Sequence, residues 1–208
     1  MSKLPEIQIT VFSDYICPFC YVGHHRLMRL KDEYDLKINW CFLEIHPENS
    51  AKGDPVTDLD YSSDFWDELM RNLKQVAKEE NIPLAEHTFT TNSKDSLLLS
   101  EASKQLGREI FYLLHEKIFT AFFVDKKNIG DRNILRDIAK DCGIDNNVID
   151  AAWSEPGYQQ QLLENFNHAR KHKIKSVPSF VFGERILTGV VDEAIMRKAA
   201  AELVKKTD

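Results

Sequence analysis

The sequence predicts an α/β protein in which helices cover both faces of a mixed sheet and a helical segment is inserted into the chain. Three observations indicate this class. A strand, a helix and a second strand succeed one another between residues 7 and 45, only helical periodicity follows as far as residue 154, and a short hairpin comes late in the 208-residue chain. We therefore expect a discontinuous α/β domain made of residues 1–60 and 155–208, with residues 61–154 forming an inserted all-helical domain.

The first two strands and the helix between them have distinct hydrophobic patterns. Ile7 to Ile16 is an apolar run that predicts a strand, and Tyr21 to Tyr34 has the helical spacing that places Leu27 and Leu30 on one buried face. Lys37 to Ile45 carries apolar residues on both faces, which is typical of a central strand covered on both sides. Two strands joined through a helix in this way are expected to be parallel, with a right-handed crossover.

The inserted segment is expected to hold several amphipathic helices. Ser63 and Ser93 are predicted N-caps, because their side chains can accept hydrogen bonds from free backbone N–H groups, and Asp131 and Asp145 are predicted to open two later helices. Gly107 and Gly143 are predicted to end helices, since glycine readily adopts the left-handed conformation that closes a helix. No strand pattern interrupts this stretch, and a segment of this size can enclose a core of its own.

The last part of the chain returns to strands. A helix ends in the basic run Arg170 to Lys173, which suits the negative end of the helix dipole. Val177 to Phe182 and Arg185 to Thr188 predict two strands joined by a two-residue turn, and Asp192 begins a final helix.

Composition excludes several classes of function. The net charge of −6 and the isoelectric point near 5.7 argue against a nucleic-acid partner and against binding to an anionic membrane surface. The apolar run from Ile118 to Val124 is too short to cross a bilayer. Met1 to Glu6 lacks the pattern of a signal peptide, so we expect a cytoplasmic protein, in a compartment that keeps thiols reduced.

Cys17-Pro18-Phe19-Cys20 lies where the first strand gives way to the first helix. Two cysteines at this spacing and in this context predict a thiol-disulfide redox centre. The free N–H groups and the dipole of a helix N-terminus stabilise a thiolate, and Pro18 suits the first helical position because its missing N–H has no role there. We expect Cys17 to be the exposed nucleophile and Cys20, one turn inside, to close the disulfide.

A zinc site is the alternative for these cysteines. Structural zinc usually takes two such pairs, or one pair and two histidines, whereas Cys41 and Cys142 are isolated in the sequence. His168 and His172 are four residues apart and could share a helix face, but they lie among lysines at a predicted helix end. We therefore predict no metal, and we expect Cys41 and Cys142 to be buried packing residues.

Two segments together resemble the thioredoxin superfamily: Ser13 to Gly23, which contains the two cysteines, and Ser176 to Phe180, which opens the late hairpin. The helical insertion is similar to that of the DsbA-like branch, and within it to the FrnE-like predicted dithiol-disulfide isomerases. Thr91-Asn92-Ser93 and Asn128 to Asp131 resemble further segments of these proteins. The resemblance implies a thioredoxin-like fold with an inserted helical domain.

The resemblance also implies a substrate site. It places a cis Val177-Pro178 bond opposite the sulfurs, with Pro18, Phe19 and Tyr21 beside it, so that an extended substrate can pair with the backbone at Val177. An ordinary trans proline at the start of an edge strand is the alternative.

One position differs from DsbA, which has a histidine between its cysteines where this chain has Phe19. A phenylalanine cannot place a charge beside a thiolate. His24 and His25, further along the helix, are interpreted as surface residues.

The implied function is a thiol-disulfide oxidoreductase or isomerase that works through a mixed disulfide with thiols or disulfides of proteins or small molecules. It needs no cofactor beyond its own redox-active disulfide, with glutathione as a candidate exchange partner. The second hypothesis is a glutathione-dependent enzyme of the kappa-class transferase or hydroxychromene-carboxylate isomerase type, in which a serine replaces Cys17. The third is a non-catalytic module that binds an apolar peptide between Phe19, Tyr21 and Pro178. No oligomeric state is predicted.

Overall fold

The structure is a computed structural model in which the chain divides into two compact units. The first comprises Met1–Leu43 and Asn165–Asp208, and the second comprises Glu44–Glu164. The residues that the structure describes are 4–59, 62–86 and 88–207.

The predicted division into one domain of residues 1–60 and 155–208 and a second domain of residues 61–154 stays a prediction. Along the chain, the boundaries between the two compact units fall between residues 43 and 44 and between residues 164 and 165. Residues 60 and 61, at the predicted boundary, lie outside the described residues.

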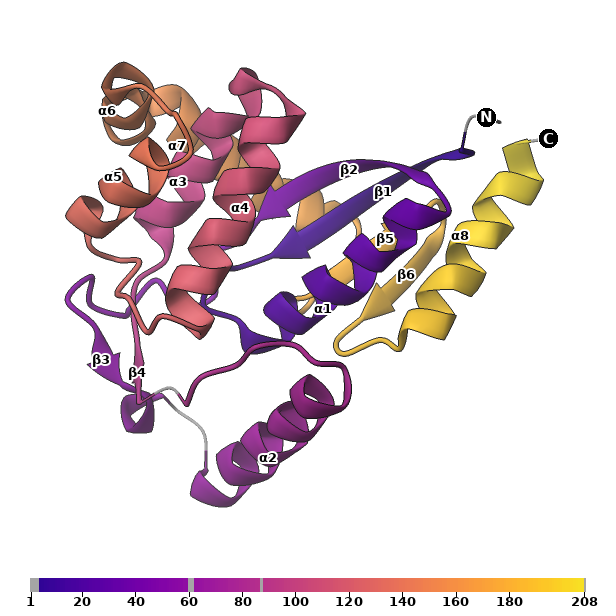
Figure 1. Cartoon of the computed structure of the whole chain (residues 1–208), viewed down its shortest axis with the longest axis horizontal. Coiled ribbons are helices and arrows are strands. Elements are labelled where there is room, and N and C mark those ends of the chain that lie inside the picture. Colours follow the sequence, from indigo (N-terminus) through magenta and orange to yellow (C-terminus); the bar gives the residue numbers. More distant parts are fainter. Residues whose placement is uncertain (1–3, 60–61, 87, 208) are drawn as a thin grey trace. The chain divides into compact units, whose positions relative to one another are not determined.

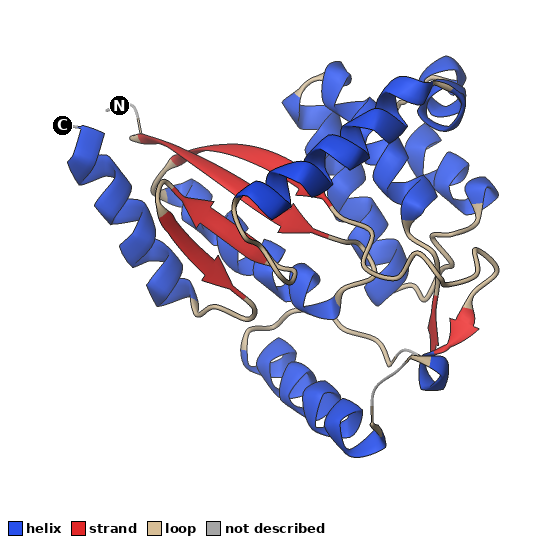
Figure 2. Cartoon of the chain, turned by 180° about the vertical axis from the view of Figure 1, so that it is seen from behind, coloured by secondary structure: helices blue, strands red, loops and turns tan. Residues whose placement is uncertain are grey.

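The first unit contains a four-stranded mixed sheet in the order β2-β1-β5-β6 (Figure 2). Its first two strands are parallel, β5 is antiparallel to β1, and β5 and β6 form the predicted hairpin. The mixed sheet is confirmed. The strands are β1 (Glu6–Ser13), β2 (Asp35–Phe42), β5 (Ser179–Phe182) and β6 (Arg185–Thr188).

The position of β2 corrects one expectation. Its two buried faces predicted a central strand, but β2 lies at one edge of the sheet. Trp40 and Cys41, which point to opposite faces, are both buried all the same. A strand can therefore be covered on both faces by helices without having a strand on each side, and hydrophobic pattern alone does not distinguish the two cases.

Strand register defines two faces of this sheet, because successive side chains alternate. Val11 pairs with Trp40 on one face and Phe12 with Cys41 on the other. Figure 1 shows helices α1 (Pro18–Met28) and α8 (Glu193–Thr207) over one face, and the last part of α7 (Pro156–Lys171), from residue 165 on, lies over the other face in Figure 2.

Contacts within the unit agree with this arrangement. The ring of His24 in α1 lies 5.8 Å from that of Trp40. On the other face, Phe12, Cys41 and Ala169 of α7 pack in one hydrophobic cluster, to which Val181 also belongs. Helices on both faces of a mixed sheet are thus confirmed.

The second unit is mainly helical, as predicted, but not entirely. Two-residue strands β3 (Asp54–Pro55) and β4 (Phe89–Thr90) pair antiparallel, and a strand this short leaves no period in the sequence. The helices are α2 (Ser63–Glu79), α3 (Lys94–Ser103), α4 (Arg108–Phe123), α5 (Arg132–Lys140), α6 (Asn146–Ser154) and the first part of α7.

Helix ends in this unit follow local chemistry. Asp131 caps α5, since its Oδ1 accepts the backbone N–H of Asn133 at 2.8 Å. Ser93 and Asp145 directly precede α3 and α6, but neither forms a side-chain capping hydrogen bond, so the cap predicted at Ser93 is wrong. Gly107 and Gly143 have positive φ angles of 97° and 75°, as expected where a helix ends.

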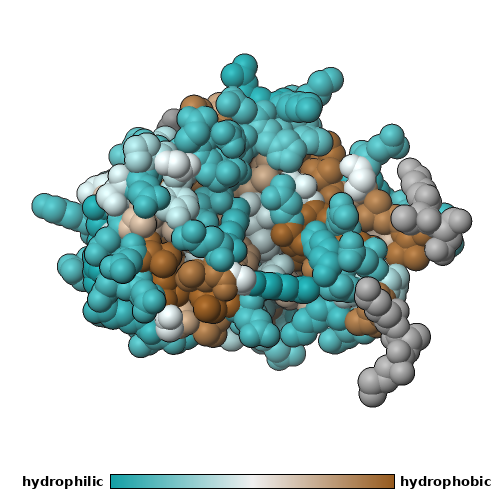
Figure 3. Space-filling view, turned by 90° about the horizontal axis from the view of Figure 1, so that it is seen from above, coloured by the Kyte–Doolittle hydropathy of each residue, from teal (hydrophilic) through white to brown (hydrophobic). Residues whose placement is uncertain are grey.

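The surface is largely polar. Figure 3 shows one face on which hydrophilic side chains predominate and apolar atoms gather in separate patches. Within the described ranges, every helix is too short or too polar to cross a bilayer.

Candidate functional site

Cys17 is the N-cap of α1. Its backbone is extended, with φ −84° and ψ 113°, and Pro18 occupies the start of the helix as predicted. The Sγ atom of Cys17 accepts the backbone N–H of Cys20 at 3.3 Å, as the hydroxyl of a capping serine would do. A negative charge on this sulfur would therefore meet an N–H donor and the positive end of the helix dipole. The local sequence builds an anion-stabilising position at Cys17.

Cys20 lies one turn further in, with only 2% of its surface exposed. Burial is the main cause that raises the pKa of its thiol well above the ordinary value, and the hydrogen bond and charge of Cys17 raise it further. Cys20 is therefore a protonated thiol at neutral pH. All four cysteines of the chain are free thiols in this structure.

The expected exposure of Cys17 is wrong, because only 5% of its surface is accessible. The carbonyl oxygen of Val177 lies 3.8 Å from its Sγ, in position to accept the thiol proton. The Val177-Pro178 peptide bond is cis. The sequence did not predict that Val177 covers the Cys17 sulfur, since the two residues are 160 positions apart.

Close packing holds the proline segment against α1. A Cβ atom at Gly23 would lie 2.8 Å from Cζ of Phe180 and 3.4 Å from Cγ of Pro178. Glycine is required here because the helix approaches the start of β5 more closely than a side chain allows. This contact fixes the helix that carries the dithiol relative to the segment that covers it.

The other predicted site residues differ in how deeply they are buried. Pro18, Phe19 and Val177 are half-buried, whereas Pro178 is buried. Tyr21 is also buried, its ring packs edge-on against His25 at 4.7 Å, and burial raises its pKa to about 12. The phenol ring of Tyr21 therefore offers no exposed wall for a substrate.

His24 corrects another expectation. It is not a surface residue, as only 3% of it is exposed. Burial, followed by the neighbouring His25, lowers its pKa to about 3. His24 is thus neutral at physiological pH and places no positive charge near the dithiol.

Sequence reasoning missed two polar residues beside the cysteines. Ser13 and Asp14 are buried at the end of β1. The side chain of Ser13 and the backbone of Asp14 hydrogen-bond to Cys20 and lower its pKa, against the larger effect of burial. Asp14 also accepts the backbone N–H of Ile16 through Oδ1 and that of Cys17 through its carbonyl, each at 3.3 Å. Polar residues that directly follow an apolar strand were the available signal.

Cys41 and Cys142 are buried, as expected for packing residues. The sulfur of Cys41 also lies 3.5 Å from Nδ1 of His168, whose other ring nitrogen contacts His172. Within residues 4–59, 62–86 and 88–207, no three histidine, cysteine or acidic side chains are grouped as metal ligands would be.

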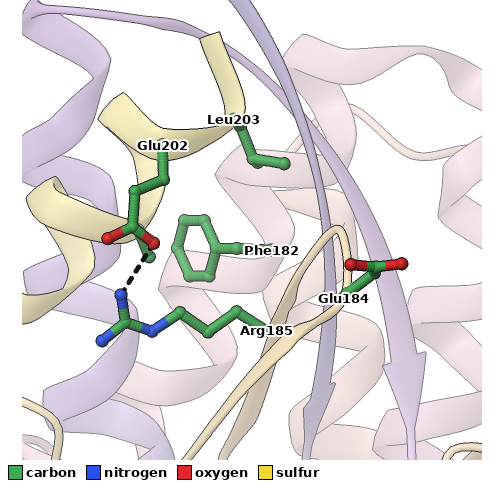
Figure 4. A pocket seen from close by; sticks show the side chains of 6 residues that line it. Phe182, Glu184, Arg185, Glu202 and Leu203 are labelled. Atoms are coloured by element: carbon green, nitrogen blue, oxygen red, sulfur yellow. Dashed lines mark hydrogen bonds and ion pairs between the residues drawn. The ribbon is translucent and has the colours of Figure 1, made fainter. Parts of the chain in front are cut away.

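A shallow pocket of about 230 Å³ lies between the β5–β6 hairpin and α8. In Figure 4, Arg185 and Glu202 face each other across it, and they form an ion pair of 2.9 Å. The pocket is lined at the turn end of β5, whereas the dithiol lies beyond the other end of that strand. It is therefore not part of the cysteine site.

Comparison with known proteins identifies this arrangement. The family described as DSBA-like thioredoxin domain matches residues 8–201. The protein named YwbO of Bacillus subtilis is 27% identical over 202 residues, which cover 96% of this chain and 98% of YwbO.

Two solved structures are similar over nearly the whole chain. A structure named "probable DsbA oxidoreductase" from Streptomyces coelicolor has a TM-score of 0.83 at 18% identity, covering 95% of this chain and 89% of that one. The cytosolic disulfide reductase DsbM from Pseudomonas aeruginosa, solved with GSH, has a TM-score of 0.67 at 14% identity and covers 97% of both chains. At these identities the likeness establishes a shared fold.

Proposed function

We propose, because the chain belongs to the family of DSBA-like thioredoxin domains, that it is a thiol-disulfide oxidoreductase with its redox centre at Cys17-Pro18-Phe19-Cys20. The observation that carries this proposal is the N-cap position of Cys17, where the N–H of Cys20 stabilises charge on its sulfur. Cys20 sits one helical turn away as a buried thiol, which suits a resolving cysteine.

The proposed reaction has two exchange steps. The Cys17 thiolate attacks one sulfur of a substrate disulfide, the substrate S–S bond breaks, and the departing thiolate takes up a proton. The Cys20 thiol then loses its proton and attacks the Cys17 sulfur of the mixed disulfide. The second substrate thiol leaves, and the dithiol has given two electrons to the substrate. The reverse sequence oxidises a substrate dithiol.

The raised pKa of Cys20 gives these steps an order. Part of the rise comes from the charge and hydrogen bond of Cys17. A mixed disulfide at Cys17 removes that charge, so Cys20 ionises more readily once the first step is complete. The second exchange step therefore becomes easier once the first has taken place.

We assign substrate contact to the residues around the Cys17 sulfur that keep some exposed surface: Pro18, Phe19 and Val177. The Val177 carbonyl lies beside the sulfur and is a ready acceptor for an extended substrate backbone. Pro178 packs against α1 at Gly23 and so fixes the position of this segment. A FrnE-like enzyme, acting in the cytoplasm on thiols and disulfides of proteins or of small molecules such as glutathione, fits this site. A protein of the same fold is named a cytosolic disulfide reductase and was solved with GSH.

The competing proposal is a glutathione-dependent isomerase or transferase. A 2-hydroxychromene-2-carboxylate isomerase shares the fold, with a TM-score of 0.76 at 17% identity. The resemblance implies a serine at the position of Cys17 in such enzymes, and the cysteine of this chain favours exchange chemistry instead.

The test is catalysis of insulin disulfide reduction by dithiothreitol, compared among the native protein, Cys17→Ser and Cys142→Ala. Native protein and the Cys142 variant should catalyse reduction equally, and Cys17→Ser should fall to the uncatalysed rate. A native protein inactive here but active in conjugating glutathione to an electrophile would favour the competing proposal. A native protein inactive in both assays that binds peptide equally well after Cys17→Ser would favour a binding module.

A further inference from the structure

Cys41 lies in an environment unlike that of a simple packing residue. Its side chain points to the face of the sheet covered by α7, and 2% of its surface is exposed. Its Sγ lies 3.5 Å from Nδ1 of His168 and 3.5 Å from the side-chain nitrogen of Asn39. Both are nitrogen groups that can donate to a thiolate, and a neutral imidazole can also accept a thiol proton.

His168 connects this sulfur to a second histidine. Its Nε2 lies 2.9 Å from Nε2 of His172, the residue that directly follows α7. The ring of Phe12 borders both imidazoles, with centroid distances of 5.6 Å and 6.5 Å. A neutral imidazole carries one N–H, so if Nδ1 of His168 accepts from the thiol, its Nε2 donates to His172.

A nucleophile, a base and a third group that orients the base are the parts of an activated thiol. From this arrangement we propose that Cys41 is a third reactive thiol, a site of oxidation by hydrogen peroxide, with His168 as its proton acceptor and His172 as the residue that positions His168.

Two further observations support this assignment over a metal site or a passive contact. Cys41 and His172 contact opposite nitrogens of the His168 ring, so one metal ion cannot be held by all three side chains. Burial, followed by His172 and Lys171, lowers the pKa of His168, so the ring is neutral at neutral pH and Nδ1 can accept a hydrogen bond from the thiol.

An exposed residue contacts the sulfur at the edge of the sheet. β2 is an edge strand, and Asn39, whose amide contacts the sulfur, is exposed. We assign the approach of a small oxidant to this side, because the sulfur itself is only 2% exposed. The site is therefore distinct from the dithiol, and it does not depend on the function proposed for Cys17 and Cys20.

The reaction is a two-electron oxidation of sulfur. The Cys41 thiol passes its proton to His168, and the sulfur attacks one oxygen of hydrogen peroxide. The O–O bond breaks, the leaving hydroxide recovers the proton from His168 to become water, and Cys41 becomes a sulfenic acid.

Cys142 provides a matched control in the same chain. It is buried to a similar extent, with 6% of its surface exposed, and burial raises the pKa of its thiol. The experiment uses a Cys17→Ser/Cys20→Ser protein, limiting hydrogen peroxide and dimedone to trap sulfenic acid, with both remaining cysteines quantified by mass spectrometry. Cys41 should be trapped at least about ten times faster than Cys142.

Three further variants in that background test the histidines. His168→Asn keeps a polar group near the sulfur but cannot accept a proton, and trapping at Cys41 should fall by about tenfold. His172→Leu should lower trapping by about threefold, while His172→Gln, which can still accept from His168, should restore it. Cys142 serves in each variant as the internal reference.

Equal trapping at Cys41 and Cys142 would overturn the proposal. So would a folded His168→Asn protein that is trapped as fast as its parent. If that variant does not fold, the ratio of Cys41 to Cys142 and the comparison of His172→Leu with His172→Gln decide the question.

Discussion

The Cys17–Cys20 dithiol and Cys41 lie in the same unit, and the helices α1 and α7 that carry or contact them lie on opposite faces of the sheet. The dithiol belongs to α1 on the Trp40 face, whereas Cys41 contacts α7 on the Phe12 face. Cys17 and Cys41 are similarly buried, at 5% and 2% exposure. The difference lies in what touches the sulfur: a backbone N–H at one, an imidazole at the other.

Under the two proposals, exposure is a poor guide to which thiol reacts. The N–H that contacts the Cys17 sulfur comes from Cys20, three residues along the chain, so this helix-capping contact is encoded locally, whereas the contact with the Val177 carbonyl is not. The contact of Cys41 with His168 joins residues 127 positions apart and exists only in the folded protein. The first site can be recognised in the sequence, whereas the second requires the structure.

Removal of each thiol should separate the two sites most clearly. Cys20→Ala should lower turnover in insulin reduction by at least about a hundredfold, because no internal thiol resolves the mixed disulfide. Cys41→Ala should leave the same turnover within about twofold, since its side chain faces away from α1. Equal losses in both variants would show that the two faces form one catalytic unit.

Close packing beneath the dithiol gives the next effect. Gly23→Ala should lower the free energy of unfolding by about 1–3 kcal/mol, because the added Cβ overlaps Phe180 and approaches Pro178. Gly157→Ala in α7 is the matched control, since a Cβ there meets no atom within 4 Å. It should be neutral or stabilise the protein by up to about 1 kcal/mol. Chemical denaturation measures both, and equal effects would contradict the close approach of α1.

Lowering the pH should destabilise the native protein through His24, which lies in the helix that carries the dithiol. The native pKa of about 3 lies below the unfolded value near 6.5, so between these values the unfolded chain binds a proton that the native protein does not. Stability is unaffected by this group above pH 6.5 and falls as the pH is lowered through that window. Between pH 7 and pH 5 the native protein should lose about 2 kcal/mol more than His24→Gln. Parallel stability curves would show that His24 is protonated in the native state.

The smallest effect concerns the cap at Cys17. Cys17→Ser should keep a hydrogen-bond acceptor for the N–H of Cys20, whereas Cys17→Ala removes it. The alanine variant should be less stable than the serine variant by about 1 kcal/mol, as measured by thermal or chemical unfolding. Equal stability of the two would mean that the sulfur contact does not cap the helix.

Much of the fold follows from local patterns in the sequence. The βαβ unit, the late hairpin and the helix ends at Gly107 and Gly143 are visible there because periodicity and turn residues act over a few positions. The edge position of β2 and the strands β3 and β4 could not be predicted in the same way. Strand order depends on pairing between distant segments, and two-residue strands have no period.

The candidate site divides similarly. Cys17, Pro18 and Cys20 are adjacent in the chain, so their N-terminal position on α1 could be predicted. The Val177 carbonyl over Cys17 and the burial of His24 result from tertiary packing. His168 and His172 were expected at a helix end because they lie among lysines, and their spacing says nothing about which strand α7 packs on.

The most direct test of the central claim is capture of the mixed disulfide. A Cys20→Ser protein is mixed with a protein substrate that contains a disulfide, quenched in acid and mapped by mass spectrometry. We expect a stable adduct on Cys17, because Cys17 attacks first and no second thiol is left to release it. An adduct on Cys41, or none on Cys17 in a folded protein, would contradict the assignment of Cys17 as the nucleophile.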